Sequence, residues 1–127
     1  MAETNLRAFN RELTTLAKRL PAESVKVLQR KIVLEALSRI VLKTPVDTGR
    51  ARGNWQTTVN TSPDDEKLSS DPVADGLGAI AKVPDFAIVY ITNNVPYIVY
   101  LESGTVSKQA PQGMVAITVE ELRGMFQ

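Results

Sequence analysis

Residues 22–43, AESVKVLQRKIVLEALSRIVLK, predict the helix around which the rest of the chain is organised. Apolar side chains recur there at three- and four-residue steps, the spacing of one face of an α-helix. They form one line and a second that widens it: Val25, Leu28, Ile32, Ala36 and Ile40, then Leu34, Leu37 and Val41. So broad a face predicts contact on two sides, with a sheet and with another helix or subunit. The helix is expected to end before Pro45, since a residue preceding proline is pushed out of the helical region.

The flanking segments carry the patterns of both helices and strands. The expected elements are a helix over Asn5–Leu20, strands over Asn54–Asn60 and Phe86–Thr92, short helical turns near Leu77–Lys82 and Pro96–Gly104, and a last helix opening at Gln109–Pro111. That last helix is expected to bury Met114, Ile117, Leu122 and Met125. We therefore predict one α+β domain over residues 1–127, with two N-terminal helices and a C-terminal helix packed on a small, mostly antiparallel β-sheet.

The composition limits the chemistry open to this chain. Histidine and cysteine are both absent from its 127 residues. Disulfides, thiolate nucleophiles, Ser–His–Asp triads and histidine bases are thereby excluded. No apolar run approaches the length of a membrane span, and the polar, charged residues 1–11 do not have the pattern of a secretory signal. We expect synthesis in the cytoplasm, no contact with a membrane, no cofactor and no enzymatic activity.

Charge is distributed unevenly along the chain. Residues 1–52 hold eleven Lys/Arg against five Asp/Glu, a balance of +6, and residues 53–127 hold four against nine, a balance of −5, so that the net charge is +1. One interpretation is two solvated helix faces followed by an acidic loop. The other is a bipolar subunit whose basic side meets a neighbour's acidic side, or DNA, which suits head-to-tail assembly.

A long acidic segment joins the two predicted strands. Residues 61–78 are rich in Ser, Asp, Pro and Gly, and predict a mobile loop of a length that is usually either functional or disordered. Its acidic residues are Asp64, Asp65, Glu66, Asp71 and Asp75. Their spacing lacks the glycine and the terminal glutamate of a calcium-binding hand loop. We therefore expect no metal site, and we take Asp64, Asp65 and Glu66 as candidate interface residues.

A first motif connects the long helix to the first strand. It reads Val46-Asp47-Thr48-Gly49-Arg50-x-Arg52-x-x-Trp55. Asp47 can bond to its local backbone, and Gly49 permits a sharp turn. We expect Trp55 to anchor the strand in the core. Arg50 and Arg52 would then point outward, either as solvated charges or towards an acidic partner or a phosphate.

A second motif follows the second strand and reads Tyr97-x-x-Tyr100-Leu101-Glu102-x-Gly104-Thr105. Tyr97, Tyr100 and Leu101 are spaced to form the apolar face of a single helical turn, which Gly104 would close. Glu102 at its end could accept a hydrogen bond from Arg50. That pair would tie the two motifs together, and we expect it to be structural rather than catalytic.

Taken in order, these residues resemble a known family. The two motifs, followed by Gln109-Ala110-Pro111-x-Gly113-Met114 before a final helix, are similar to the tail-completion, neck or head–tail joining proteins of long-tailed bacteriophages. The resemblance covers roughly residues 20–126. It carries no catalytic residues to this chain. Its matching positions, which imply fold or interface roles, are Asp47, Gly49, Arg50, Trp55, Tyr97, Glu102 and Gly104.

The resemblance implies a virion protein at the head–tail junction that acts by assembly. Copies would form a homo-oligomeric ring of roughly six or twelve subunits, closed by rotational symmetry, around the DNA channel. Its partners would be itself and other neck, connector and tail-tube proteins, close to packaged DNA without reading its sequence. A tail terminator that caps the tube is the alternative in the same class. A nonspecific DNA-binding protein using Lys18, Arg19, Lys26, Arg30 and Lys31 is the alternative from another class.

Overall fold

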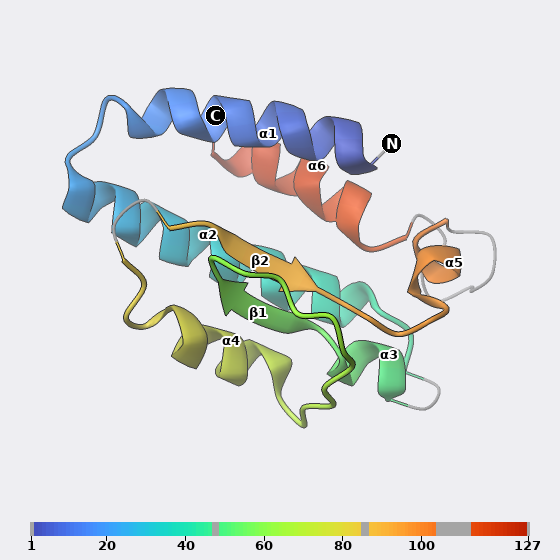
Figure 1. The fold of residues 1–127 in the computed structure, drawn as a ribbon. Helices are drawn as coiled ribbons and strands as arrows, with labels where there is room; N and C mark the ends of the chain where they lie inside the picture. Colours follow the sequence, from blue (N-terminus) through green and yellow to red (C-terminus); the bar gives the residue numbers. More distant parts are fainter. Residues whose placement is uncertain (1, 47–48, 85–86, 104–112, 127) are drawn as a thin grey trace.

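The computed structural model describes residues 2–46, 49–84, 87–103 and 113–126. Figure 1 shows helices surrounding a small sheet, and the predicted α+β class is confirmed. In chain order the elements are α1 (Ala2–Ala17), α2 (Ala22–Lys43), α3 (Arg50–Gly53), β1 (Gln56–Val59), α4 (Pro72–Ile80), β2 (Val89–Thr92), α5 (Ile98–Glu102) and α6 (Val115–Met125). Among the described helices, none is long and apolar enough to cross a membrane.

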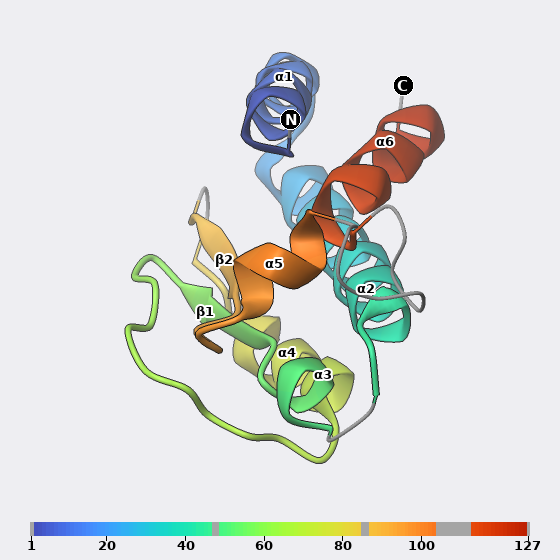
Figure 2. The same ribbon diagram turned by 90° about the vertical axis from the view of Figure 1, so that its right-hand side faces the viewer.

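Helix α2 lies at the centre of the fold and has the predicted bounds. It contacts α4 on one side and α6 on another, and α6 in turn packs against α1 (Figures 1 and 2). Leu37 and Ile40 belong to a cluster with Trp55 and Met114, whereas Ala36 belongs to a second cluster with residues of α1 and α6. Contact on two sides is thus confirmed, but helices α4 and α6 provide most of it, where a sheet was expected on one side. Leu34, which was predicted to widen the buried face, is 38% exposed.

The two strands pair antiparallel, with Gln56 opposite Thr92 and Val59 opposite Val89. Asn60 closes the pair at its far end. Its backbone N–H donates to the Ile88 carbonyl at 2.7 Å, and its side-chain oxygen accepts from the Ile88 N–H at 3.1 Å. Asn60 has a φ of 68°, a conformation that asparagine tolerates better than most residues. Both strands are shorter than predicted, and Phe86 lies outside the described residues.

Helix α4 corrects the expectation of a loop over residues 61–78. The Asp71 side chain accepts a hydrogen bond from the Ala74 N–H at 3.1 Å, and Pro72 occupies the first helical position. Both are standard helix-starting features. The helix therefore begins well before the expected turn at Leu77. Residues 61–71 do lack helix and strand, as predicted.

Helix α6 buries a different face from the predicted one. Met114 and Leu122 are buried as expected, but Ile117 is only half-buried and Met125 is 44% exposed. Thr118 and Val119 are buried instead. The cause is that α6 packs against both α1 and α2, so its buried face is set by two neighbours. Asn5 on α1 adds a direct link, because its side-chain N–H donates to the Ala116 carbonyl at 3.0 Å.

Gly76 allows α4 to approach α2 and β1, and this gives a test of the packing. A Cβ at this position would overlap the fully buried Leu37 side chain and come within 2.8 Å of Thr57 Oγ1. We expect Gly76→Ala to lower the free energy of unfolding by about 1–2 kcal/mol, because overpacking outweighs the gain in helix propensity. Gly78→Ala is the matched control on the same helix, since its Cβ would meet nothing within 4 Å. Denaturant melts giving equal or higher stability for Gly76→Ala would contradict this packing.

Candidate functional site

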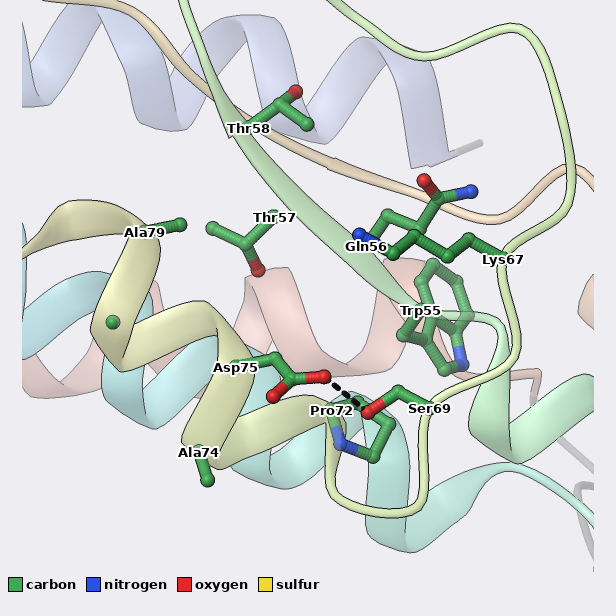
Figure 3. Close-up of a pocket in the computed structure, with 11 residues that line it drawn as sticks. Trp55, Gln56, Thr57, Thr58, Lys67, Ser69, Pro72, Ala74, Asp75 and Ala79 are labelled. Carbon is green, nitrogen blue, oxygen red and sulfur yellow. Dashed lines mark hydrogen bonds between the residues drawn. The ribbon is translucent and has the colours of Figure 1, made fainter.

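Trp55 stands between a surface hollow and the core. The hollow has a volume of about 480 Å³ and lies between β1, α4 and residues 67–69 (Figure 3). At its mouth the Ser69 hydroxyl donates to Asp75 Oδ2 at 2.5 Å. Asp75 is the only carboxylate among the lining residues, and a serine bonded to a lone carboxylate without a histidine is not an activated nucleophile. The hollow therefore offers hydrogen bonds but no recognisable catalytic arrangement.

The inner side of Trp55 is tied to the end of α2. Its indole N–H donates to Thr44 Oγ1 at 2.8 Å, and that hydroxyl donates to the Ile40 carbonyl at 2.7 Å. Trp55 is 5% exposed and Thr44 1%. The predicted role of Trp55 as the anchor of the first strand is confirmed, with a buried threonine as its partner.

Arg52 binds the same end of α2 from the surface side. The expectation that it points away from the fold is therefore wrong. Its Nε donates to the Thr44 carbonyl at 3.0 Å, and its Nη2 donates to the Leu42 carbonyl at 2.9 Å. These carbonyls lie at the C-terminal end of α2, where a helix lacks internal partners and favours a cation. Arg52 therefore caps α2.

Arg50 pairs with Glu66 rather than with Glu102. Its Nε and Nη2 donate to the two carboxylate oxygens at 2.8 and 2.7 Å, and the guanidinium lies 5.6 Å from the centre of the Tyr97 ring. The hydrogen bond from Arg50 lowers the pKa of Glu66. Gly49, with a φ of 74°, begins α3 in the left-handed conformation that the motif predicted. Asp47 lies outside the described residues.

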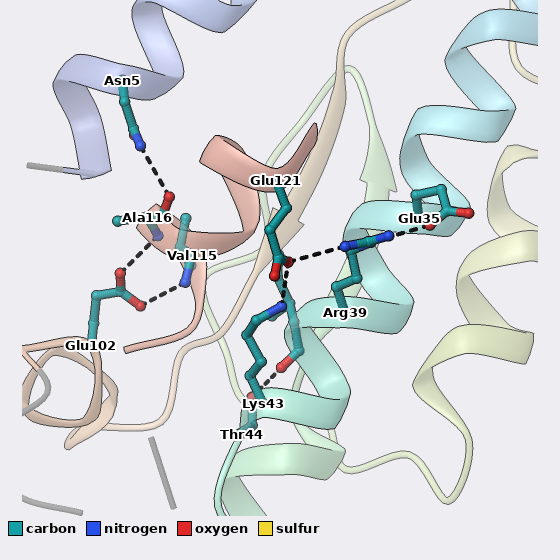
Figure 4. Close-up of polar contacts among 10 residues, drawn as sticks. Asn5, Glu35, Arg39, Lys43, Thr44, Glu102, Val115, Ala116 and Glu121 are labelled. Atoms are coloured by element: carbon teal, nitrogen blue, oxygen red, sulfur yellow. Dashed lines mark hydrogen bonds and ion pairs between the residues drawn. The ribbon is translucent and has the colours of Figure 1, made fainter. Parts of the chain in front are cut away.

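Glu102 instead caps helix α6 (Figure 4). Its carboxylate accepts hydrogen bonds from the backbone N–H groups of Met114, Val115 and Ala116 at 2.9, 2.8 and 3.0 Å. A carboxylate suits this position, because the first N–H groups of a helix lack internal partners and carry partial positive charge. The expected Arg50–Glu102 pair is therefore wrong, since both groups are occupied elsewhere.

The rest of the second motif divides between core and surface. Tyr97 packs against the core and Leu101 is buried, but Tyr100 is 65% exposed, contrary to the predicted apolar face. A single helical turn can bury only one of its sides against the core, and Tyr100 lies on the other side. Gly113 has a φ of +75°, and a Cβ there would overlap the Glu102 carbonyl. Gly104 lies outside the described residues.

The acidic residues of the connecting segment serve separate roles. Glu66 binds Arg50, Asp71 caps α4, and Asp75 binds Ser69. The side chains of Asp64 and Asp65 are exposed. Across the parts of the chain that the structure describes, no three acidic side chains converge to hold a metal ion.

A charge cluster between α2 and α6 was not predicted. Glu121 accepts hydrogen bonds from Lys43 Nζ at 2.6 Å and from Arg39 Nη1 at 3.2 Å, and Arg39 also binds Glu35 (Figure 4). The hydrogen bond from Lys43, with that from Arg39, lowers the pKa of Glu121. The spacing of Arg39 and Lys43 puts both on one helix face, but nothing in the sequence identified their partner Glu121, which lies 82 residues after Arg39 and 78 after Lys43.

No protein-family model matches this chain, and no curated protein or solved structure is similar to it. The resemblance to phage neck proteins stays a prediction from the motif residues and their order.

The Glu102 cap can be tested by stability. We expect Glu102→Ala to cost about 2 kcal/mol of unfolding free energy, because three helix N–H groups lose their acceptor. Glu102→Gln should cost less, since one side-chain oxygen remains. Glu23→Ala, at an exposed position on α2, is the control. Denaturant melts in which Glu102→Ala matches the control would rule out the cap.

The Glu121 cluster predicts a pH dependence. Its pKa is lowered in the folded state, so its contribution to stability is complete above the ordinary glutamate value of 4.5 and is lost as pH falls through the folded value. We expect Glu121→Gln to destabilise the protein at pH 7 by no more than about 1 kcal/mol, because solvent screens the cluster. The difference from the parent protein should shrink below pH 4.5 and in 1 M salt. A difference that grows in acid would have the wrong sign.

Proposed function

We propose that this protein is a structural subunit of a phage neck, where copies form a ring that joins head and tail around the DNA channel. The observation that carries the proposal is the ordered set of motif residues that resembles the tail-completion family. The structure adds a physical reason for that order. Trp55 ties the start of β1 to the end of α2, and Glu102 ties the end of α5 to the start of α6, so both motifs lie where elements of the fold are joined.

The surface supports action by assembly. Large apolar side chains are exposed at several places outside the motifs, among them Leu42 at 72%, Leu68 at 69% and Val27 at 63%. Side chains of this kind are available to pack against a neighbouring subunit. The polar motif residues Arg50, Arg52 and Glu102 are occupied by internal hydrogen bonds. Contacts with partners would therefore fall to residues outside the motifs.

The two alternative functions, tail terminator and DNA-binding protein, need different features of the surface. A tail terminator would use the same fold at the end of the tail tube. A DNA-binding protein needs a row of free cations, but Arg30 already donates to the Ala81 carbonyl at 3.2 Å, and Lys26 also has a partner. Lys18, Arg19 and Lys31 are exposed. Because two of the five predicted cations already have partners, the remaining three favour contact with a protein over binding along a DNA duplex.

The test is electron microscopy of phage particles assembled without this chain. We expect filled heads beside unattached tails, and joining on addition of purified protein. A purified Glu102→Ala variant, folded at low temperature, should also join them, because Glu102 holds the frame and not the partner.

Three other results would change the conclusion. Tails of abnormal length would indicate tail termination. Normal, infectious particles would contradict a role in the neck. Tight duplex binding that does not depend on base sequence and weakens steeply as salt rises would favour the nonspecific DNA-binding protein, because its contacts would be to phosphates.

A further inference from the structure

A second hollow lies at the corner between α1 and α2. Its volume is about 460 Å³, and it is open to solvent. Its lining residues are Leu20, Glu23, Ser24, Val27, Leu28 and Lys31. Val27 is 63% exposed there, although it sits in the central helix of the fold. The corner thus leaves an apolar depression uncovered.

One cation, Lys31, and one anion, Glu23, line this hollow, and two further cations precede its lining residue Leu20 in the chain. Lys31 lines it, and Lys18 and Arg19 belong to the turn that leads from α1 into α2. All three side chains are exposed, and none has an ion-pair partner in the described parts of the chain. An apolar depression beside free cations fits an apolar side chain flanked by carboxylates.

The segment before α4 has that character, and its backbone is held in place. Gln56 donates to the Asp65 carbonyl at 2.6 Å, and Asn94 donates to the Pro63 carbonyl at 2.9 Å. The backbone N–H of Lys67 donates to Asn54 Oδ1 at 2.7 Å. Such clamping reduces the entropy that binding would otherwise cost.

Part of this clamped segment is available to a partner, whereas Glu66 is paired with Arg50 and one side of Leu68 lies against Gly53. Asp64 and Asp65 are exposed, and their carboxylates accept no hydrogen bond from the described residues. Leu68, three residues on, is 69% exposed. Residues 64–68 thus present two free carboxylates and one apolar side chain on a rigid backbone.

We infer that residues 64–68 of one copy dock into the α1–α2 hollow of a second copy. Leu68 would cover Val27, and Asp64 and Asp65 would face the cations around the hollow. Lys67 would meet Glu23, and Glu66 would stay paired with Arg50 of its own copy. The inference rests on the proposed function, in which copies assemble, and it names the two surfaces that meet.

This contact is head-to-tail. On one molecule the hollow lies at the corner of α1 and α2, whereas the segment follows β1 and leads to α4 (Figure 1). The two surfaces are different, so a single contact leaves the hollow free on one copy and the segment free on the other. Such a contact propagates into a ring or a chain and does not stop at a dimer.

The test uses disulfide trapping, for which the absence of cysteine makes the chain well suited. One copy carries Val27→Cys and the other Leu68→Cys. We expect this mixture to cross-link about tenfold faster than Val27→Cys mixed with Val99→Cys, because a specific contact raises the effective thiol concentration. Val99 is 74% exposed, so the control thiol is at least as accessible. Equal rates for the two mixtures would overturn the proposal.

Charge reversal provides the second arm. Reversing Lys18, Arg19 and Lys31 to Glu in the first copy should abolish the excess rate. Reversing Asp64 and Asp65 to Lys in the second copy as well should restore it. Added salt should reduce the excess rate, because a few tenths molar screens exposed charges beyond several ångströms. A cross-linking rate that is unchanged by both charge reversals would show that these charges do not direct the contact.

The outcomes separate this inference from the proposed function. Specific cross-linking by a protein that has no effect on head–tail joining would support this contact between copies and contradict the proposed role in the neck. Equal cross-linking rates for the two mixtures, from a protein that does restore joining, would support the proposed role in the neck and contradict this contact between copies.

Discussion

The buried hydroxyl of Thr44 is the constraint on which the arrangement of α2 and the sheet depends. It accepts from Trp55 and donates to Ile40, while the Thr44 carbonyl accepts from Arg52. Three polar groups at the end of one helix are thereby satisfied away from solvent, where an unpaired group would cost about 1–3 kcal/mol. Trp55 then enters the core at a defined point, so β1 begins at a set position beside α2. The positions of the sheet, of α4 and of the connecting segment all depend on where β1 begins.

The parts of the fold that local pattern decides could be predicted. Helix α2 was predicted with its observed bounds because its apolar periodicity is uninterrupted and Pro45 follows it. The start of α4 was missed, although Asp71 and Pro72 are helix-starting residues, because the acidic and glycine-rich composition suggested a loop. The buried face of α6 was misjudged for a different reason. Two neighbouring helices decide it, and neither is visible in a local window.

The candidate site shows the same division. Trp55 and Gly49 were predicted correctly, since an aromatic at a strand start and a glycine in a turn have local meaning. The partners of Arg52 and Glu102 could not be predicted, because each binds backbone groups that only the fold brings close. Arg39 and Glu121 lie 82 residues apart in the chain, and their pairing carries no sequence signal.

A separation of roles follows. The motif residues Arg52, Trp55 and Glu102 hold the frame, and the proposed assembly would use exposed residues outside the motifs. The most direct test measures unfolding free energy and head–tail joining on the same two variants, Thr44→Val and Asp64→Asn/Asp65→Asn. The account predicts that the first loses stability but still joins heads to tails at low temperature. It predicts that the second keeps its stability and joins poorly. Stability loss in the second variant, with normal joining, would contradict it.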